Sequence, residues 1–322
     1  MADVKRWTIG LVKFAVAAVL LGVLIKIFID NFGQIQVYLS RLDWRFVAVA
    51  AAAQAVINWV VYELWLIMIR RLGGRIGRRP AWKAFFLPYV ARYVPGKVAL
   101  VAGKVYYCVE EGIPGRKAVI SILVENVLII IAGLSLAAIS SFYLFRGLIS
   151  PAVSACLLIA AVLLLCSLHP AVLRRIINIP MRLFGREPVR SDELLSLPAI
   201  LAFFVGYAVL WPLGGLVYGL AAAALDPGLL SRVFTVGAAF ITAGSLGQAT
   251  MLAPAGLGVR EGVLYLLLEG ETGPALAVAA VALARLITVF IDVAFAAATP
   301  LITGRRNNSI SDENADPPQQ RP

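Results

Sequence analysis

Positively charged side chains stand beside a Pro-Gly break inside a chain that is otherwise rich in apolar residues. The break is Pro95-Gly96, and Lys97 occupies the first turn of the half-helix expected to restart after it. The unsatisfied N–H groups and the positive dipole end of such a helix start attract anions. Lys104 follows seven residues later and falls on nearly the same face, within about 20° at about 100° per residue. Because Gly96 and Gly103 share this spacing and leave the backbone accessible to a bulky head group, the pattern predicts an anion site suited to phosphate.

A second break repeats this arrangement near the other end of the chain. In "APAGLGVREG" a helix is expected to restart after Pro254, Gly256 and Gly258, with Arg260 in its first turn and Glu261 beside it. A cation again stands at the N-terminus of a half-helix. Pairs of Pro/Gly-broken segments in opposite orientations point to a transporter's binding site, where half-helix ends meet near the membrane midplane. Prolines that merely kink ordinary helices are the alternative interpretation.

Further ionisable residues lie inside apolar stretches. Arg285 and Asp292 share a face of the last predicted span but lie about 10.5 Å apart along its axis, so we expect each to pair with other residues. Glu125 and its neighbour Asn126 are candidate partners for the intramembrane cations. Charges at membrane depth are costly enough to be functional candidates, although ion pairs that only hold the helices together are an alternative. The complete candidate substrate-binding set is Arg92, Pro95, Gly96, Lys97, Gly103, Lys104, Glu125, Pro254, Gly256, Gly258, Arg260, Glu261, Arg285 and Asp292.

The composition predicts the elements that must position these residues. Of 322 residues, 61% are hydrophobic and 15% are charged, which indicates an all-α polytopic membrane protein. We expect one transmembrane domain over 1–303, followed by a disordered cytoplasmic tail over 304–322. The three cysteines and the single histidine lack the spacing of a disulfide framework or a metal site, so no metal or cofactor is expected. Full spans are predicted at about 8–29, 44–69, 118–143, 148–168, 194–224 and 275–303.

Two apolar stretches are interrupted and do not read as simple spans. The stretch at about 81–111 has two limbs, each too short to cross alone, and the stretch at about 233–269 breaks near Pro254. Positive loops stay cytoplasmic, and placing both termini there leaves only Arg41, Arg45, Arg146 and Arg232 on the opposite side. The first broken stretch must then enter and leave from the cytoplasm. Whether the second is re-entrant or fully crossing stays open, because its first limb is long enough to cross. The result is an inverted repeat of helix, broken hairpin and helix.

Two glycine-rich stretches imitate enzyme motifs without satisfying them. "GLGVREG" places its third glycine one residue too late for a dinucleotide site, and no strand precedes it. "GKVALVAGKV" separates its glycines by six residues instead of four and has Val105 where a P-loop needs Ser or Thr. Without a hydrolase motif either, we expect no enzyme activity and no catalytic residues.

The two broken stretches resemble the lysylphosphatidylglycerol synthase transmembrane family, also described as flippase-like integral membrane proteins. "VPGKVALVAGKVYYCVEEGIPGRKAVISILVEN", from Val94 to Asn126, is similar to the first motif, a Pro-Gly-basic turn followed by a second basic residue and a later Glu. "APAGLGVREGVLYLLLEG", with Arg285 beyond it, is similar to the second. The resemblance implies lipid movement and not lipid synthesis, because the soluble catalytic domain of the aminoacyl-transferring members is missing.

We therefore expect a multi-pass protein of the bacterial inner membrane that binds and translocates an anionic lipid, either a phospholipid or a polyprenyl-phosphate-linked glycan. In this hypothesis Lys97, Lys104 and Arg260 bind the phosphate, while Glu125, Arg285 and Asp292 gate it or balance its charge. A non-catalytic membrane partner of envelope lipid or glycan enzymes is one alternative. A membrane-embedded transferase is another. The expected partners are the lipid and the membrane, with a homo-oligomer or envelope-biosynthesis enzymes left open and no nucleic acid.

Overall fold

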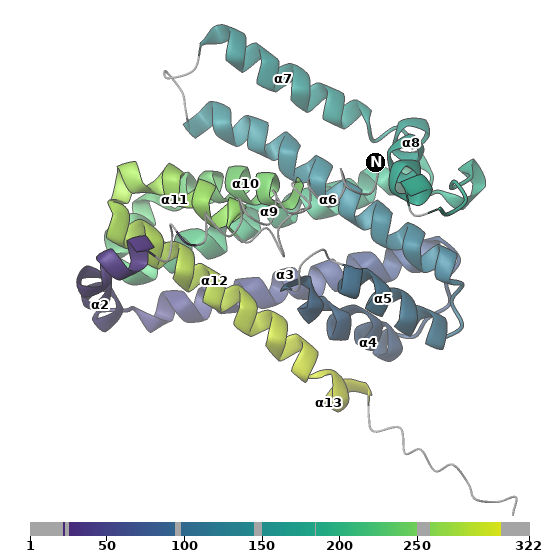
Figure 1. The fold of residues 1–322 in the computed structure, drawn as a ribbon, viewed down its shortest axis with the longest axis horizontal. Coiled ribbons are helices and arrows are strands. Elements are labelled where there is room, and N and C mark those ends of the chain that lie inside the picture. Colours follow the sequence, from purple (N-terminus) through teal and green to yellow (C-terminus); the bar gives the residue numbers. More distant parts are fainter. Residues whose placement is uncertain are drawn as a thin grey trace, which may run out of the picture.

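The computed structural model describes residue 22 and residues 26–93, 98–144, 150–183, 185–249 and 258–303. Within these ranges all regular elements are helices, which confirms the prediction of an all-α polytopic membrane protein (Figure 1). In chain order they are α2 (Phe32–Ser40), α3 (Trp44–Arg71), α4 (Arg78–Tyr89), η1 (Val90–Tyr93), α5 (Val98–Glu110), α6 (Gly115–Leu144), α7 (Pro151–Cys166), α8 (Pro170–Leu183), η2 (Ser191–Glu193), α9 (Leu197–Leu225), η3 (Pro227–Arg232), α10 (Val233–Ala249), α11 (Val259–Thr272), α12 (Pro274–Ala297) and α13 (Thr299–Thr303).

Five helical segments of the described chain are long and apolar enough to cross a bilayer. They are Trp44–Arg71, Gly115–Phe142, Leu197–Leu225, Pro227–Ala249 and Pro274–Thr303. Four of them match predicted spans, whereas the predicted span 8–29 lies mostly outside the described residues. The span predicted at 148–168 contains a shorter helix than expected. Its helix, α7, has only 16 residues, and the chain then bends by 89° into α8, so the two helices together make at most one further span.

The two interrupted stretches differ in length. In the first, α4 has 12 residues and α5 has 13, so each limb covers about 20 Å and is too short to cross, as predicted. In the second, η3 and α10 form a 23-residue segment that is long enough to cross, while α11 has 14 residues. In chain order each pair of limbs stands between longer helices: α4 and α5 between α3 and α6, and α10 and α11 between α9 and α12.

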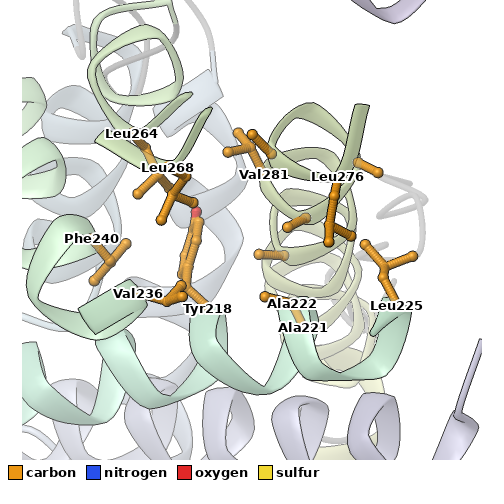
Figure 2. Packing of buried hydrophobic residues seen from close by; sticks show 14 of the residues in the cluster. Tyr218, Ala221, Ala222, Leu225, Val236, Phe240, Leu264, Leu268, Leu276 and Val281 are labelled. Carbon is orange, nitrogen blue, oxygen red and sulfur yellow. The ribbon is translucent and has the colours of Figure 1, made fainter. Parts of the chain in front are cut away.

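Small residues bring α9 and α10 into close contact. A Cβ added at Gly215 would lie 2.9 Å from the Gly237 Cα, and one at Gly219 would lie 2.4 Å from a side-chain carbon of Val233. Gly215 and Gly219 therefore allow close packing of the two helices. The same part of α9 faces α10, α11 and α12, with Tyr218 near Phe240, Leu264 and Leu268 (Figure 2). This apolar core fixes where α11 and α12 can place their charges.

We expect Gly215→Ala to lower the free energy of unfolding by about 1–3 kcal/mol, because the new methyl group meets backbone atoms of Gly237 that cannot rotate away. Gly270→Ala is the matched control. A Cβ at Gly270 has no neighbour within 4 Å, so this variant should be neutral or more stable by about 0.5–1 kcal/mol. Thermal unfolding in detergent measures both variants. Equal melting temperatures would show that the α9–α10 contact is not tight.

A bidentate ion pair holds the segment after α8 against α6. Arg116 donates from Nε to Glu193 Oε1 over 2.6 Å and from Nη2 to Oε2 over 2.8 Å, and it also donates to the carbonyl oxygens of Glu187 and Pro188. The hydrogen bonds from Arg116 lower the pKa of Glu193 to about 2. The segment between α8 and α9 is therefore fixed to the end of α6.

The Glu193 carboxylate should make stability depend on pH. Because its pKa is lower in the folded protein than in the unfolded chain, its contribution is complete above about pH 4.5 and is lost as the pH falls towards 2. For a partly exposed pair we expect about 1 kcal/mol. The stability difference between wild type and Glu193→Gln, measured by thermal unfolding from pH 6 downwards, should shrink over that window. A pH-independent difference would contradict this assignment.

Candidate functional site

A buried carboxylate on α12 accepts hydrogen bonds from polar groups at the end of the first broken limb. Asp292 is fully buried, and its Oδ2 accepts hydrogen bonds from the Tyr93 hydroxyl at 2.5 Å and from Arg92 Nη1 at 3.3 Å. Its Oδ1 accepts a hydrogen bond of 2.8 Å from Asn58 Nδ2, and Asn58 Oδ1 in turn accepts one from Gln54 on the same helix, α3. The η1 turn is thus attached to both α3 and α12.

The start of α11 carries a second carboxylate that is surrounded by donors. Gly258, at a positive φ of 84° that favours glycine, donates its N–H to Glu261 Oε2 over 3.0 Å. Glu261 Oε1 accepts hydrogen bonds from Arg260 Nε at 3.2 Å and Nη2 at 2.9 Å. Arg285 Nη1 approaches the same oxygen to 3.7 Å. A protein carboxylate therefore occupies the helix N-terminus that the sequence predicts as an anion site.

Arg285 is partly buried, and its terminal nitrogens lack hydrogen-bond partners among the described residues. Both nitrogens, Nη1 and Nη2, are enclosed. Its guanidinium lies over the Tyr93 ring at 5.0 Å from the ring centre, and the Arg92 guanidinium lies 5.7 Å from the same centre. The Tyr93 ring therefore lies near guanidinium groups from both parts of the site: Arg92 near the first break, and Arg285, which approaches Glu261 near the second.

We call Arg92, Arg260, Glu261, Arg285 and Asp292 the central charged cluster. It contains three guanidinium groups and two carboxylates, so the described part of the cluster has an excess of one positive charge. A buried charge without a full set of partners costs several kcal/mol. The cluster is therefore suited to binding an additional anion.

Lys104 has a counterion of its own. Its Nζ forms an ion pair of 2.9 Å with Glu125 Oε2, as the sequence suggested for Glu125, and the Phe85 ring centre lies 3.8 Å from it. Lys104 and Glu125 are 3% and 4% exposed, so a phosphate would have to displace Glu125 to reach the ammonium. The expectation for Gly103 needs correction. A Cβ there would lie 2.8 Å from Pro88 Cβ, so packing of α4 on α5 takes the room expected for a head group.

The remaining sequence predictions divide into three groups. Pro95, Gly96, Lys97, Pro254 and Gly256 lie outside the described residues. Arg285 and Asp292 contact different partners, as their spacing predicts, whereas Asn126 donates to the Ile122 carbonyl and joins no cation in the described structure.

The sequence reasoning missed Gln54, Asn58 and Tyr93. Two amides spaced by four residues in an apolar span would have indicated the first two.

Comparison with known proteins agrees with the resemblance seen in the two motifs. The family model described as the lysylphosphatidylglycerol synthase TM region matches residues 10–296, which include every residue of the central charged cluster. No curated protein matches the chain. The family model covers most of the 322 residues. The chain therefore belongs to the family of the lysylphosphatidylglycerol synthase transmembrane region.

Proposed function

We propose that the protein binds the phosphate of an anionic lipid at the central charged cluster and moves that lipid between the leaflets of the bacterial inner membrane, with both chain termini in the cytoplasm. The observation that carries this proposal is the enclosed guanidinium of Arg285, whose terminal nitrogens find no acceptor among the described residues. A phosphate would supply the missing oxygen atoms. Family membership supports a lipid-related role for this membrane domain.

The chemistry of the cluster favours phosphate. A guanidinium presents a planar set of N–H donors that matches two oxygens of one phosphate, and such charge-assisted bonds are stronger than neutral ones. The cluster has one positive charge beyond its carboxylates, so one anionic group would bring it to neutrality. A zwitterionic lipid also carries a phosphate, but its additional cation would restore the excess charge.

Glu261 and Asp292 would act as internal substitutes for the phosphate. Glu261 accepts hydrogen bonds from the Gly258 N–H and from Arg260, and Asp292 forms an ion pair with Arg92. When a lipid phosphate arrives beside Arg285, it can exchange with these carboxylates, and they can return to the arginines when the lipid leaves. No arginine then has to stand alone at membrane depth, where an unpaired charge is most costly. Lys104 and Glu125, already paired, would support the fold around the first broken limb.

Reconstitution into vesicles tests this proposal directly. Fluorescent anionic and zwitterionic phospholipids placed in one leaflet are followed by their accessibility to a membrane-impermeant quencher. We expect faster transfer of the anionic lipid with protein than without it, and a slower rate with Lys97→Ala. Anionic transfer that equals the protein-free rate would contradict transport. Equal rates for Lys97→Ala and wild type would count against the phosphate site at the first break.

A further inference from the structure

The helix α8 has three distinct sides, and only one of them is covered by the described part of the chain. Leu173, Ile177 and Met181 recur every four residues and are buried in the apolar cluster that also contains Ile200 and Phe203 of α9. The remaining two sides of α8 face outward.

One outward side is apolar and the other is basic. At about 100° per residue, Val172, Ile179 and Leu183 fall within about 40° of one another, and their exposures are 38%, 60% and 60%. Arg175 and Arg182 are also exposed and lie next to this apolar side, within about 20° of each other. The helix contains no acidic residue.

The direction and anchoring of α8 are also defined. It is bent by 89° from α7, so α8 runs parallel to the membrane surface if the apolar α7 lies across the bilayer. Asn178 on α8 donates to the Val189 carbonyl and accepts from the Val189 N–H at 2.6 Å, and the following segment is fixed by Arg116. The outward sides are therefore presented in a fixed orientation.

We propose that α8 is an interfacial helix that binds the head groups of anionic lipids in the leaflet against which it lies. Its exposed apolar side would enter the acyl region, and Arg175 and Arg182 would contact lipid phosphates beside it. The adjacent apolar and basic sides fit a membrane better than a water-soluble acidic protein, because Ile179 and Leu183 would gain no apolar environment from such a partner. This surface is separate from the central charged cluster and does not depend on transport.

Energy transfer between the protein and lipids tests the proposal. The full chain carries Ile179→Cys, with Cys156→Ser and Cys166→Ser to remove the two exposed thiols, and a donor fluorophore is attached at position 179. The protein is reconstituted in vesicles of phosphatidylcholine with traces of acyl-labelled phosphatidylglycerol or phosphatidylcholine. We expect phosphatidylglycerol to be enriched near the donor by about 10-fold at low salt, and less at high salt.

Three pairs of substitutions make the outcome specific. Arg175→Gln with Arg182→Gln should bring the enrichment close to one, whereas Arg71→Gln with Arg75→Gln removes the same charge elsewhere and should leave it unchanged. Arg175→Lys with Arg182→Lys should retain most of it, which separates loss of charge from misfolding. Equal energy transfer from both lipids in the wild type would overturn the proposal. Enrichment that survives loss of both α8 arginines would do the same.

Discussion

Arg285→Met is expected to slow the movement of anionic lipids by about 10- to 100-fold without destabilising the protein. The reduction follows from the loss of one charge-assisted hydrogen bond to phosphate, worth about 1.5–3 kcal/mol. Stability should be unchanged or improved, because the terminal nitrogens of Arg285 have no acceptor among the described residues and an apolar side chain removes their burial cost. The transfer assay and thermal unfolding in detergent measure these two effects.

This combination of effects distinguishes a binding role from a structural one. If Arg285 served only to hold Glu261, its removal would destabilise the fold, although Arg260 would still bind Glu261 at 2.9 Å. Arg285→Lys keeps the charge but loses the planar pair of donors, so it should give an intermediate rate. Arg71→Met, on an exposed residue at the end of α3, is the control for loss of positive charge. An Arg285→Met protein that unfolds readily yet moves lipid at the wild-type rate would refute the binding role.

The positions of the helices that form the site could be predicted from the sequence, whereas most of the side-chain contacts between those helices could not. The apolar runs indicated where α3, α6, α9 and α12 lie, because hydropathy and helix length determine which segments cross a bilayer. The spacing of Arg285 and Asp292 also predicted that they seek different partners, since seven residues separate side chains by about two turns. Both inferences depend only on local geometry.

The contacts that define the cluster could not be predicted in this way. Asn58 and Tyr93 meet Asp292 from positions more than 190 residues away in the chain, and their register depends on how α3 and η1 pack against α12. The prediction for Gly103 was wrong for the same reason, because the close neighbour is Pro88 on a separate limb. Glu261 could be recognised beside Arg260, but its hydrogen bond to the Gly258 N–H depends on the backbone turn at the start of α11.

Asp292→Ala is expected to lower the free energy of unfolding by about 3–5 kcal/mol, the largest stability loss among these variants. The substitution removes the acceptor for Asn58, Tyr93 and Arg92 together and leaves a partly buried guanidinium without its carboxylate. Thr288→Val, about one turn away on α12, is the control. The Thr288 hydroxyl bonds only the Ala284 carbonyl in the described contacts, so its loss should cost about 1 kcal/mol or less. If Asp292→Ala unfolded at the same temperature as Thr288→Val, the η1–α12 contact would not be holding the fold together.

Asp292→Asn separates this structural role from exchange with phosphate. The amide retains one oxygen for Asn58 or Tyr93 but removes the charge that neutralises Arg92, so the loss of stability should be smaller than in the alanine variant. With its counterion gone, Arg92 should hold a lipid phosphate more firmly, and the lipid should leave more slowly even as its binding tightens. Binding of a labelled anionic lipid to the detergent-solubilised protein should therefore strengthen while transfer between leaflets slows. Adding Arg92→Gln to Asp292→Asn should abolish the tighter binding, because the two side chains act as a pair. If both binding and transfer remained at wild-type values in Asp292→Asn, the carboxylate would not be competing with the lipid for Arg92.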